Sequence, residues 1–416
     1  MKGALAVLIA RLRRIQAVVE LAFLRALLAL ALRPSAASGT SKDKPGQSKG
    51  KPQDILVLRP DEIGDMVLAL PLLRALRRRY PRARLSLLAQ PLPGGLAMEL
   101  GLADEIIPLA GGRAFLPVLQ PAWRAWRAAR GLRGLRGRGF DLLLHPRWGA
   151  DFRQAGLLAA LVPAARKVAF DAGDSPEQLE WNCLPATVWS ARVRSGGAHE
   201  IAHLMDFMEA LGLGRPRAWE RRLSSPALRG QAVRRLAACG KGPWLAVAPF
   251  ARSRRRVWPL EHWASLVRDL AAQRGLRPWV LAGPGEEQEA ADLAQRLGPG
   301  TPVFAGLGLR EVAALLSQAR LFAGADSSGA QIAAAEGVPC LVLSCHPLGA
   351  PVWHANAPER FGPWGVESLV LRPATHAWPC RRGCEAFMAH CILKLDPLQA
   401  RAAALDWRPG PRRPRP

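Results

Sequence analysis

The 416-residue sequence has few acidic side chains: 33 Asp and Glu stand against 58 Lys and Arg, which gives a formal net charge of +25. Such an imbalance favours anionic partners, among them nucleic acid, acidic lipid surfaces and phosphorylated substrates. Arginine greatly outnumbers lysine, and Ala, Leu, Gly and Pro are plentiful, a composition that a GC-rich genome also produces. A second explanation therefore stays open, in which the excess arginine serves only solubility.

The sequence also lacks the cysteine pattern of a secreted disulfide scaffold, because its seven cysteines are odd in number and unevenly spread. Four of them are single and three are clustered: Cys183, Cys239, Cys340 and Cys345, then Cys380, Cys384 and Cys391. A reduced, cytosolic chain is expected. A helix-turn-helix or RNA-recognition signature is also missing, so we predict no nucleic-acid partner.

A long uncharged run is missing from the hydrophobic N-terminal segment, residues 1–33, in which five charged residues interrupt the apolar ones. Its longest uncharged run is therefore too short to span a bilayer, and the segment fits a signal peptide poorly. It predicts a basic amphipathic helix that lies on an anionic membrane surface, or else packs on the protein itself. Residues 34–53, rich in Ser, Gly, Lys and Pro, predict a flexible linker.

Short apolar runs alternate with helical patterns from residue 54 onward and start again near residue 243. This alternation predicts an α/β fold of two Rossmann-like, doubly wound domains that face each other across a cleft. We expect domains at residues 54–235 and 236–398, followed by a basic Pro/Arg-rich tail at 399–416. A ligand is expected at the carboxyl ends of the strands.

The sequence H-E-I-A-H at residues 199–203 matches the signature of a zinc metalloprotease helix. A helical projection places both histidines with Asp206, opposite an apolar stripe made of Ile201, Leu204, Met205, Met208 and Leu211. A zinc site would need a third ligand, for which Glu220 is the nearby candidate. We expect a connecting helix with two histidines on its polar face, and a zinc hydrolase remains the alternative.

The first strand-to-helix turn carries Gly64 and Asp65, after Arg59 at the strand end. Backbone N–H groups at such a helix start attract an anion, which makes Arg59 and Gly64 candidates for anion or acceptor binding. A carboxylate there stays ionised, so Asp65 is available as a general base for a substrate hydroxyl. The alternative is that Asp65 only caps the helix.

Three turns of the second half carry polar residues at equivalent places. Ser253 and Arg256 lie in an arginine-rich loop that suits a pyrophosphate, unless the loop is merely solvated. Glu287 follows a glycine turn and could hold ribose hydroxyls, or serve only as N-terminal helix charge. Residues 326–329 (Asp-Ser-Ser-Gly) end a strand and begin a small-residue helix that offers backbone donors to a phosphate.

These motifs, in this order and spacing, resemble glycosyltransferase family 9, the heptosyltransferases of lipopolysaccharide core assembly. The matching elements are Arg59 with Ile63-Gly64-Asp65 and "PLLRALRRRYP", Arg256-Val257-Trp258-Pro259, Gly283 to Glu287, and the run from Asp326 to Ala335. The resemblance covers residues 54–398. It implies a GT-B fold and an inverting, metal-independent transfer without a cofactor, from a nucleotide-sugar donor similar to ADP-heptose.

The resemblance also implies roles for single residues. Asp65 would be the catalytic base, Arg256 and Ser253 would neutralise the leaving pyrophosphate, and Glu287 would hold the ribose. The donor sugar and phosphates would be bound by residues at the last turn: Asp326, Ser327, Ser328, Gly329 and Gln331. Gln331, Ser328 and Arg256 replace the family's usual His, Gly and Lys, so an altered donor pocket or an inactive homologue stays an alternative.

The acceptor that the resemblance implies is an anionic glycolipid, lipopolysaccharide core or a related molecule, at the inner face of the inner membrane. We therefore expect a monomeric cytoplasmic protein in peripheral contact with that membrane. A basic stripe is a second candidate for phosphate contacts, or a solvated helix face: Arg124, Arg127, Arg130 and Arg133. The cluster of Cys380, Cys384 and Cys391 beside His390 could be a Cys3His zinc site or a redox pair, but its spacing departs from C-x2-C and two adjacent residues do not easily bind one ion. The resemblance implies a structural cluster without a metal, because family members carry a similar one near the C-terminus.

Overall fold

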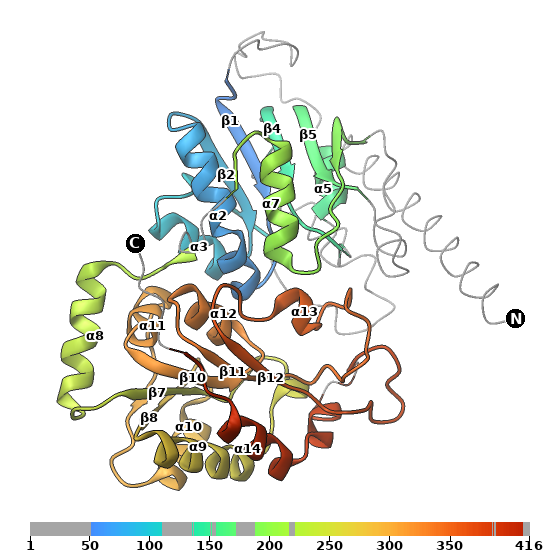
Figure 1. Ribbon diagram of the computed structural model, residues 1–416. Helices are drawn as coiled ribbons and strands as arrows, with labels where there is room; N and C mark the ends of the chain where they lie inside the picture. The colour runs from blue at the N-terminus through green and yellow to red at the C-terminus, as the bar shows by residue number, and fades with distance from the viewer. Residues whose placement is uncertain are drawn as a thin grey trace, which may run out of the picture. The chain divides into compact units, whose positions relative to one another are not determined.

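The computed structural model describes residues 51–109, 135, 137–149, 151, 155–171, 188–215, 221–384, 386 and 388–410 (Figure 1). Several of the predictions fall outside these residues: the N-terminal helix, most of the linker, the arginine stripe at 124–133, Cys183, Glu220 and the last six residues. Within the described residues, no helix has both the length and the apolar character needed to cross a membrane.

The chain forms two compact units, one of residues 1–197 and 202–216 and the other of residues 198–201 and 217–416. The boundary differs from the predicted 235/236, because helix α8 (Pro226–Ala238) packs against α11 (Leu309–Leu316) of the second unit. Helix α7 (Glu200–Ala210) is shared, since its first two residues belong to the second unit.

The first unit contains one parallel six-stranded sheet in the order β3-β2-β1-β4-β5-β6. Its strands are β1 (Asp54–Leu58), β2 (Arg84–Ala89), β3 (Glu105–Pro108), β4 (Phe140–His145), β5 (Ala164–Phe170) and β6 (Ala191–Val193). Its remaining described helices are α2 (Ile63–Arg79), α3 (Pro91–Glu99) and α5 (Ala155–Leu161). Leu56 and Leu58 of β1 pack with Leu158 of α5 in one hydrophobic core.

The second unit contains another parallel six-stranded sheet, in the order β12-β11-β10-β7-β8-β9. Its strands are β7 (Trp244–Ala248), β8 (Arg277–Leu281), β9 (Val303–Phe304), β10 (Ala319–Ala325), β11 (Cys340–Leu343) and β12 (Ser368–Leu371). Further helices are η4 (Arg254–Arg256), α9 (Leu260–Arg274), α10 (Glu287–Leu297), α12 (Ser328–Ala335), α13 (Pro358–Phe361), η5 (Cys391–Lys394) and α14 (Pro397–Asp406).

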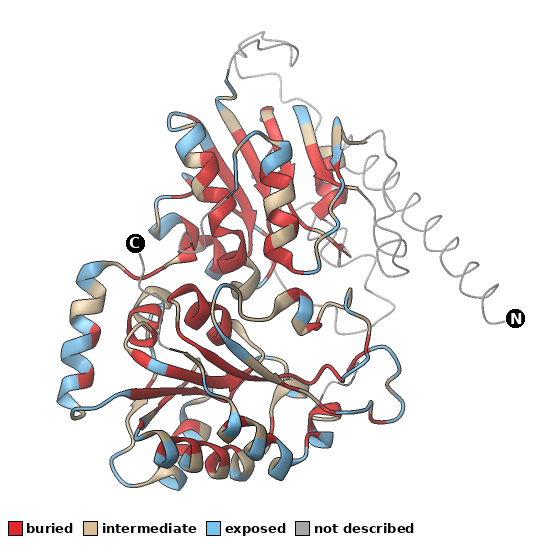
Figure 2. Ribbon diagram, in the orientation of Figure 1, coloured by how far each residue is buried: buried red, intermediate tan, exposed pale blue. Residues whose placement is uncertain are grey.

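Both faces of the second sheet are covered, so its central strands β7 and β10 are buried except for Arg320 (Figure 2). Helices α9, α10 and α14 share a core with Leu245 and Val247, while α11 and α12 lie on the other side of the sheet (Figure 1). Residues 399–406, predicted as tail, are therefore part of the unit. Asp396 starts α14 by accepting hydrogen bonds from the backbone N–H groups of Leu398 and Gln399, at 2.8 and 3.0 Å.

The sequence predicted two doubly wound domains, and each sheet has the doubly wound strand order 3-2-1-4-5-6 when its own strands are counted. In such a sheet a ligand binds outside the carboxyl ends of the strands, where the order reverses. This rule points to the segments after β1 and β4 in the first unit, and after β7 and β10 in the second. The predicted cleft between the two domains stays a prediction.

Candidate functional site

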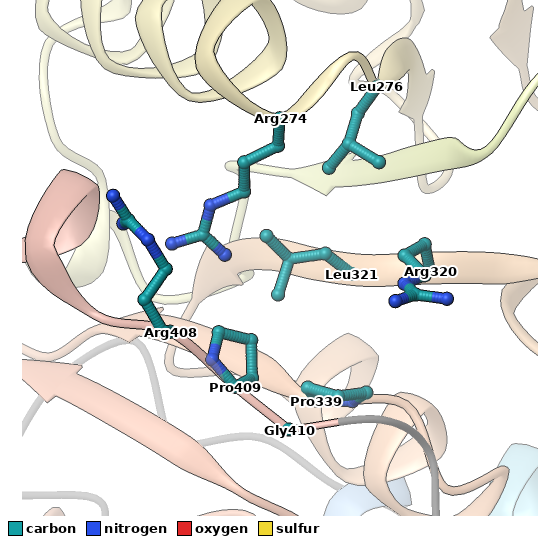
Figure 3. A pocket seen from close by; sticks show the side chains of 8 residues that line it. All are labelled: Arg274, Leu276, Arg320, Leu321, Pro339, Arg408, Pro409 and Gly410. Carbon is teal, nitrogen blue, oxygen red and sulfur yellow. The ribbon is translucent and has the colours of Figure 1, made fainter.

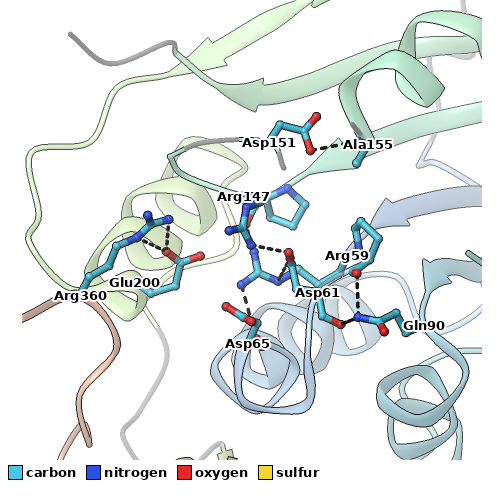
Figure 4. A network of polar contacts seen from close by, with 11 residues as sticks. Arg59, Asp61, Asp65, Gln90, Arg147, Asp151, Ala155, Glu200 and Arg360 are labelled. Carbon is cyan, nitrogen blue, oxygen red and sulfur yellow. Dashed lines mark hydrogen bonds and ion pairs between the residues drawn. The ribbon is translucent and has the colours of Figure 1, made fainter. Parts of the chain in front are cut away.

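A buried arginine–carboxylate network joins the ends of β1 and β4 (Figure 4). Arg59 is fully buried, and its Nη1 donates to the carbonyl oxygen of Pro146 at 2.7 Å. Its Nε lies 3.3 Å from the Asp61 carboxylate, which also pairs with Arg147. Two guanidinium groups thus share the Asp61 carboxylate. Arg59 lies at the end of β1, as predicted, but it is fully buried and paired with Asp61, so its role in anion binding stays a prediction. The sequence interpretation did not single out Asp61 and Arg147.

Asp65 lies in the first turn of α2 and is partly exposed, whereas the residues after it are buried. Its backbone carbonyl accepts a hydrogen bond from Nη2 of Arg59 at 3.4 Å. The helix N-cap is Glu62, not Asp65. Arg59 therefore fixes the backbone that presents the Asp65 carboxylate, and Gly64 precedes it within the same first turn.

His145, the last residue of β4, is a second residue that the sequence interpretation did not single out. It is buried and stacks on Trp189 with ring centroids 5.8 Å apart. Burial lowers its pKa, although the carboxylates of Asp151 and Asp61 act in the opposite direction. Among the described residues, none hydrogen-bonds its buried Nε2 atom. Its position at the carboxyl end of the strand beside β1 was the signal that could have identified it.

In the second unit, Arg256 connects the loop after β7 to the end of β10. Its Nη1 donates to the backbone oxygen of Asp326 at 2.5 Å, and its Nη2 donates to Oδ1 of Asn356 at 2.7 Å. The Asp326 carboxylate accepts a hydrogen bond from Ser344 at 3.1 Å. Both acceptors that hold Arg256 are neutral oxygens, so these contacts orient its positive charge without cancelling it.

Neighbouring groups fix this arrangement. Arg255 donates from Nε to Oγ of Ser253 at 2.9 Å and from Nη1 to the Cys384 oxygen at 2.8 Å. The Asn356 backbone N–H donates to Nδ1 of His354 at 3.1 Å, which requires that nitrogen to be unprotonated. Burial accordingly lowers the pKa of His354 to about 4. Asn356 and His354 lie about a hundred residues from Arg256, and no local pattern in the sequence pointed to either of them.

Ser327, Ser328 and Gly329 open α12 immediately after Asp326. Gln331, one turn later, is buried and donates from Nε2 to the Phe361 oxygen at 2.5 Å. The buried Oε1 of Gln331 accepts no hydrogen bond from the residues that the structure describes. Glu287 is exposed at the start of α10, while Glu286 accepts the backbone N–H of Gly283 at 2.8 Å. The structure therefore brings Ser253, Arg256 and the start of α12 to one sheet edge, with Glu287 at the same edge.

The helix with the H-E-x-x-H sequence is not arranged as a zinc site. Glu200 is buried and accepts two hydrogen bonds from Arg360, at 3.1 and 3.2 Å (Figure 4). Nε2 of His199 lies 2.9 Å from the Gly362 oxygen, and its Nδ1 accepts the Ile201 N–H at 3.1 Å. Both ring nitrogens of His199 are thus engaged, and burial lowers its pKa to about 4.

The burial of His203 also contradicts the prediction that both histidines lie on the polar face of this helix. His203 is fully buried, stacks on Trp148 at 3.9 Å between ring centroids, and its Nδ1 lies 2.7 Å from Oγ of Ser195. Oγ of Ser195 also donates to Asp206 at 2.5 Å. The projection was wrong about this face because aromatic rings and polar partners from distant segments cover it. These contacts argue against the zinc hydrolase hypothesis.

A pocket in the second unit lies at the opposite edge of the sheet from the predicted site. It is lined by Arg274, Leu276, Arg320, Leu321, Pro339, Arg408, Pro409 and Gly410 (Figure 3). Arg320 and Pro339 mark the amino ends of β10 and β11, where doubly wound sheets do not bind nucleotides. Arg274 donates to the carbonyl oxygens of Ala404 and Trp407, which indicates a role in anchoring α14.

Comparison with known proteins supports the predicted family. Residues 154–387 match the model of glycosyltransferase family 9 (heptosyltransferase). This segment includes every predicted donor-binding residue, whereas Arg59, Gly64 and Asp65 precede it. No curated protein sequence matched the chain.

Solved structures show the same fold. A family 9 glycosyl transferase from Veillonella parvula is 17% identical, with 77% of this chain and 86% of that chain covered and a TM-score of 0.57. The E. coli heptosyltransferase WaaC with ADP is 19% identical, with 77% and 94% covered and a TM-score of 0.56. The E. coli ADP-heptose lipopolysaccharide heptosyltransferase II is 18% identical, with 85% and 98% covered and a TM-score of 0.52.

Proposed function

Since the chain belongs to glycosyltransferase family 9, we propose that it transfers a sugar, with heptose the expected one, from a nucleoside diphosphate donor to a glycolipid acceptor. The acceptor we propose is lipopolysaccharide core or a related anionic glycolipid at the inner face of the inner membrane. The excess of basic residues is consistent with two anionic substrates. The N-terminal segment would bring the enzyme to the membrane surface.

The arrangement of Arg256 is the observation that carries this proposal. Arg256 is oriented by the Asp326 oxygen and by Asn356, so its charge remains available to a pyrophosphate. Ser253 lies in the same loop, and the start of α12 offers backbone N–H groups beside it. In this proposal Glu287 holds the ribose hydroxyls, and ADP is the expected nucleotide because WaaC was solved with it.

For the chemical step we propose a direct displacement that inverts the anomeric carbon. The acceptor hydroxyl oxygen forms the new bond to that carbon while the bond to the phosphate oxygen breaks. The hydroxyl proton passes to the Asp65 carboxylate, and the electron pair of the breaking bond stays on the nucleoside diphosphate. Arg256 stabilises the charge that develops on this leaving group, which is the task a metal ion performs in other transferases. Arg59 positions Asp65 through its backbone oxygen.

Two substitutions separate binding from catalysis. Asp65→Ala should keep nucleotide affinity and lose at least 100-fold in kcat, on the order expected for a missing general base. Arg256→Ala should weaken ADP binding by at least about tenfold, because a charge-assisted contact is worth about 1.5–3 kcal/mol. Arg254→Ala is a matched control in the same turn, since Arg254 is exposed and pairs with Glu289 at 3.2 Å. Calorimetric titration with ADP and a sugar-transfer assay measure the two effects.

The donor sugar is tested separately, because Gln331 occupies the position of the family's usual histidine. One N–H of its amide is bound to the Phe361 oxygen, and its buried Oε1 accepts no hydrogen bond from the described residues. An altered donor pocket therefore stays the alternative. Thermal-shift screening against a panel of nucleotide sugars distinguishes a heptose donor from an altered donor pocket. Stabilisation by ADP-heptose supports heptose as the donor sugar, and stabilisation by a different nucleotide sugar supports the altered pocket. If none of the nucleotides or nucleotide sugars stabilises the protein, the transferase proposal is contradicted.

A further inference from the structure

Four potential metal ligands converge in the second unit, although the sequence spacing predicted otherwise. We call Cys380, Cys384, His390 and Cys391 the cysteine cluster; their ligand atoms all lie within 4.8 Å of one another. Nδ1 of His390 is 3.5 Å from the Cys380 sulfur and 3.6 Å from the Cys391 sulfur. Among the residues that the structure describes, it is the one group of three or more such side chains within ligand distance.

The two distances from His390 to the sulfurs match a tetrahedral metal site. With Zn–S bonds of about 2.3 Å and Zn–N bonds of about 2.0–2.1 Å, tetrahedral geometry places S and N ligand atoms about 3.5 Å apart. The adjacent residues His390 and Cys391 reach one point because His390 is not helical: it precedes η5 with φ −148° and ψ −88°. The backbone turn there removes the objection to adjacent ligands.

The surroundings of the cysteine cluster also resemble those of a metal site. Nε2 of His390 lies 3.0 Å from the Trp378 carbonyl oxygen, which leaves Nδ1 directed at the sulfurs. Histidine ligands of metals usually bind a carbonyl or carboxylate through their other nitrogen in this way. Cys384 and Cys391 are fully buried.

We propose that the cysteine cluster binds one thiophilic transition-metal ion, with zinc expected, as a structural site with three cysteine ligands and one histidine. Zinc suits four closed ligands of this type, and ferrous iron has a similar preference for tetrahedral thiolate surroundings. Such an ion contributes directly to folding energy, since the unfolded chain has no preformed site. It would fix the segment between Trp378 and Cys391, whose described residues form little regular secondary structure.

The cluster also contacts the proposed donor loop. Arg255 donates to the Cys384 oxygen and to Ser253, and η4 contacts η5. The metal would therefore position Ser253 and Arg256 from outside the site, an effect that rests on the proposed function. Metal content itself does not depend on that function.

The test is the metal content of the full chain, purified under reducing conditions without chelator and measured by inductively coupled plasma mass spectrometry. About one equivalent of zinc or iron is expected, falling to about a tenth or less in Cys384→Ser and Cys391→Ser. Cys239→Ser is the matched control, because Cys239 is a free, half-buried cysteine at the end of α8. This variant should keep the metal.

A second measurement does not depend on how the variants fold. Wild-type protein is stripped with a chelator and titrated with Co²⁺, and the visible bands of tetrahedral thiolate cobalt are recorded. Metal loading should raise the Tm and protect three thiols from a thiol reagent. The proposal is overturned if the reduced wild type binds neither zinc, iron nor cobalt, or if a disulfide among the three cysteines is found in the freshly isolated protein. ADP binding that fails with the metal present would instead contradict the proposed function.

Discussion

Replacing Glu200 by alanine tests whether the glutamate of the H-E-x-x-H sequence is structural. Glu200 and Arg360 are 0% and 1% exposed, and their closest atoms are 3.1 Å apart. The substitution leaves the Arg360 guanidinium buried without its carboxylate. Removing one partner of such a pair costs about 3–5 kcal/mol, most of it the penalty of an uncompensated buried charge. In a unit of this size 1 kcal/mol lowers the Tm by about 2–4 °C, so we expect a decrease of about 6–20 °C.

The same helix offers a matched control. Glu209 pairs with Arg215 at 3.1 Å, but the two side chains are 61% and 66% exposed. Glu209→Ala should therefore change stability by less than about 1 kcal/mol, and this small effect should vanish at high salt. Thermal and urea unfolding, followed by tryptophan fluorescence and circular dichroism, measure both variants.

A double variant identifies the cause of the loss. Glu200→Ala combined with Arg360→Met removes both charges, and should recover most of the stability because apolar replacements of buried ion pairs are often neutral. The reasoning is refuted if Glu200→Ala is no more destabilising than Glu209→Ala, or if the second substitution adds to the loss. A zinc-dependent hydrolytic activity abolished by Glu200→Ala at unchanged Tm would restore the zinc hydrolase hypothesis.

Three further outcomes follow from buried polar groups. In the folded state the pKa of His199 is lowered from 6.5 to about 4. Between pH 6.5 and 4 the imidazole is therefore protonated in the unfolded state but not in the folded state, so the free energy of unfolding falls by about 3 kcal/mol as the pH drops from 6.5 to 4. Urea unfolding of His199→Gln should show a shallower decline, and an unchanged slope would contradict the assignment. Glu336→Ala should cost about 3 kcal/mol or more in chemical denaturation, since the buried carboxylate accepts hydrogen bonds from Leu223 and Ser224 at 2.7–3.0 Å. Gln331→His should change the sugar preference of the enzyme and alter its affinity for ADP by less than about threefold, because we assign the binding of the nucleotide phosphates to Arg256. A larger loss of ADP affinity would refute the assignment of sugar binding to Gln331 and phosphate binding to Arg256.

Much of the fold could be predicted from strand and helix patterns. The turns after β1, β7 and β10 were located from apolar runs followed by Gly, Asp or Ser, and these turns carry Asp65, Arg256 and Asp326. Other elements gave weaker signals. The segment of α3 contains two prolines and two glycines, as a loop would. It nevertheless forms a helix, and Gly94 lets this helix approach β3 closely: a Cβ there would lie 2.9 Å from the Ile106 side chain.

The partners of the site residues could not be predicted, because they are distant in sequence. Arg256 meets Asn356 100 residues later, and Arg360 meets Glu200 160 residues earlier. A helical projection assigns His199 and His203 to a polar face because it counts only the helix's own residues. Trp148 and Trp364 come from other segments and bury them.

The sequence by itself determined the doubly wound class, the order of the turns and the residue types at each turn. Hydrophobic periodicity and turn chemistry act over a few residues, so they can be read locally. Only the tertiary structure decided which polar groups are neutralised and which stay available. Arg360 forms an ion pair with Glu200, and a neutral backbone oxygen binds Arg256. The ligand atoms of His390 and Cys391 lie within 4.8 Å of each other. These outcomes depend on burial and on contacts between distant segments, which no local pattern encodes.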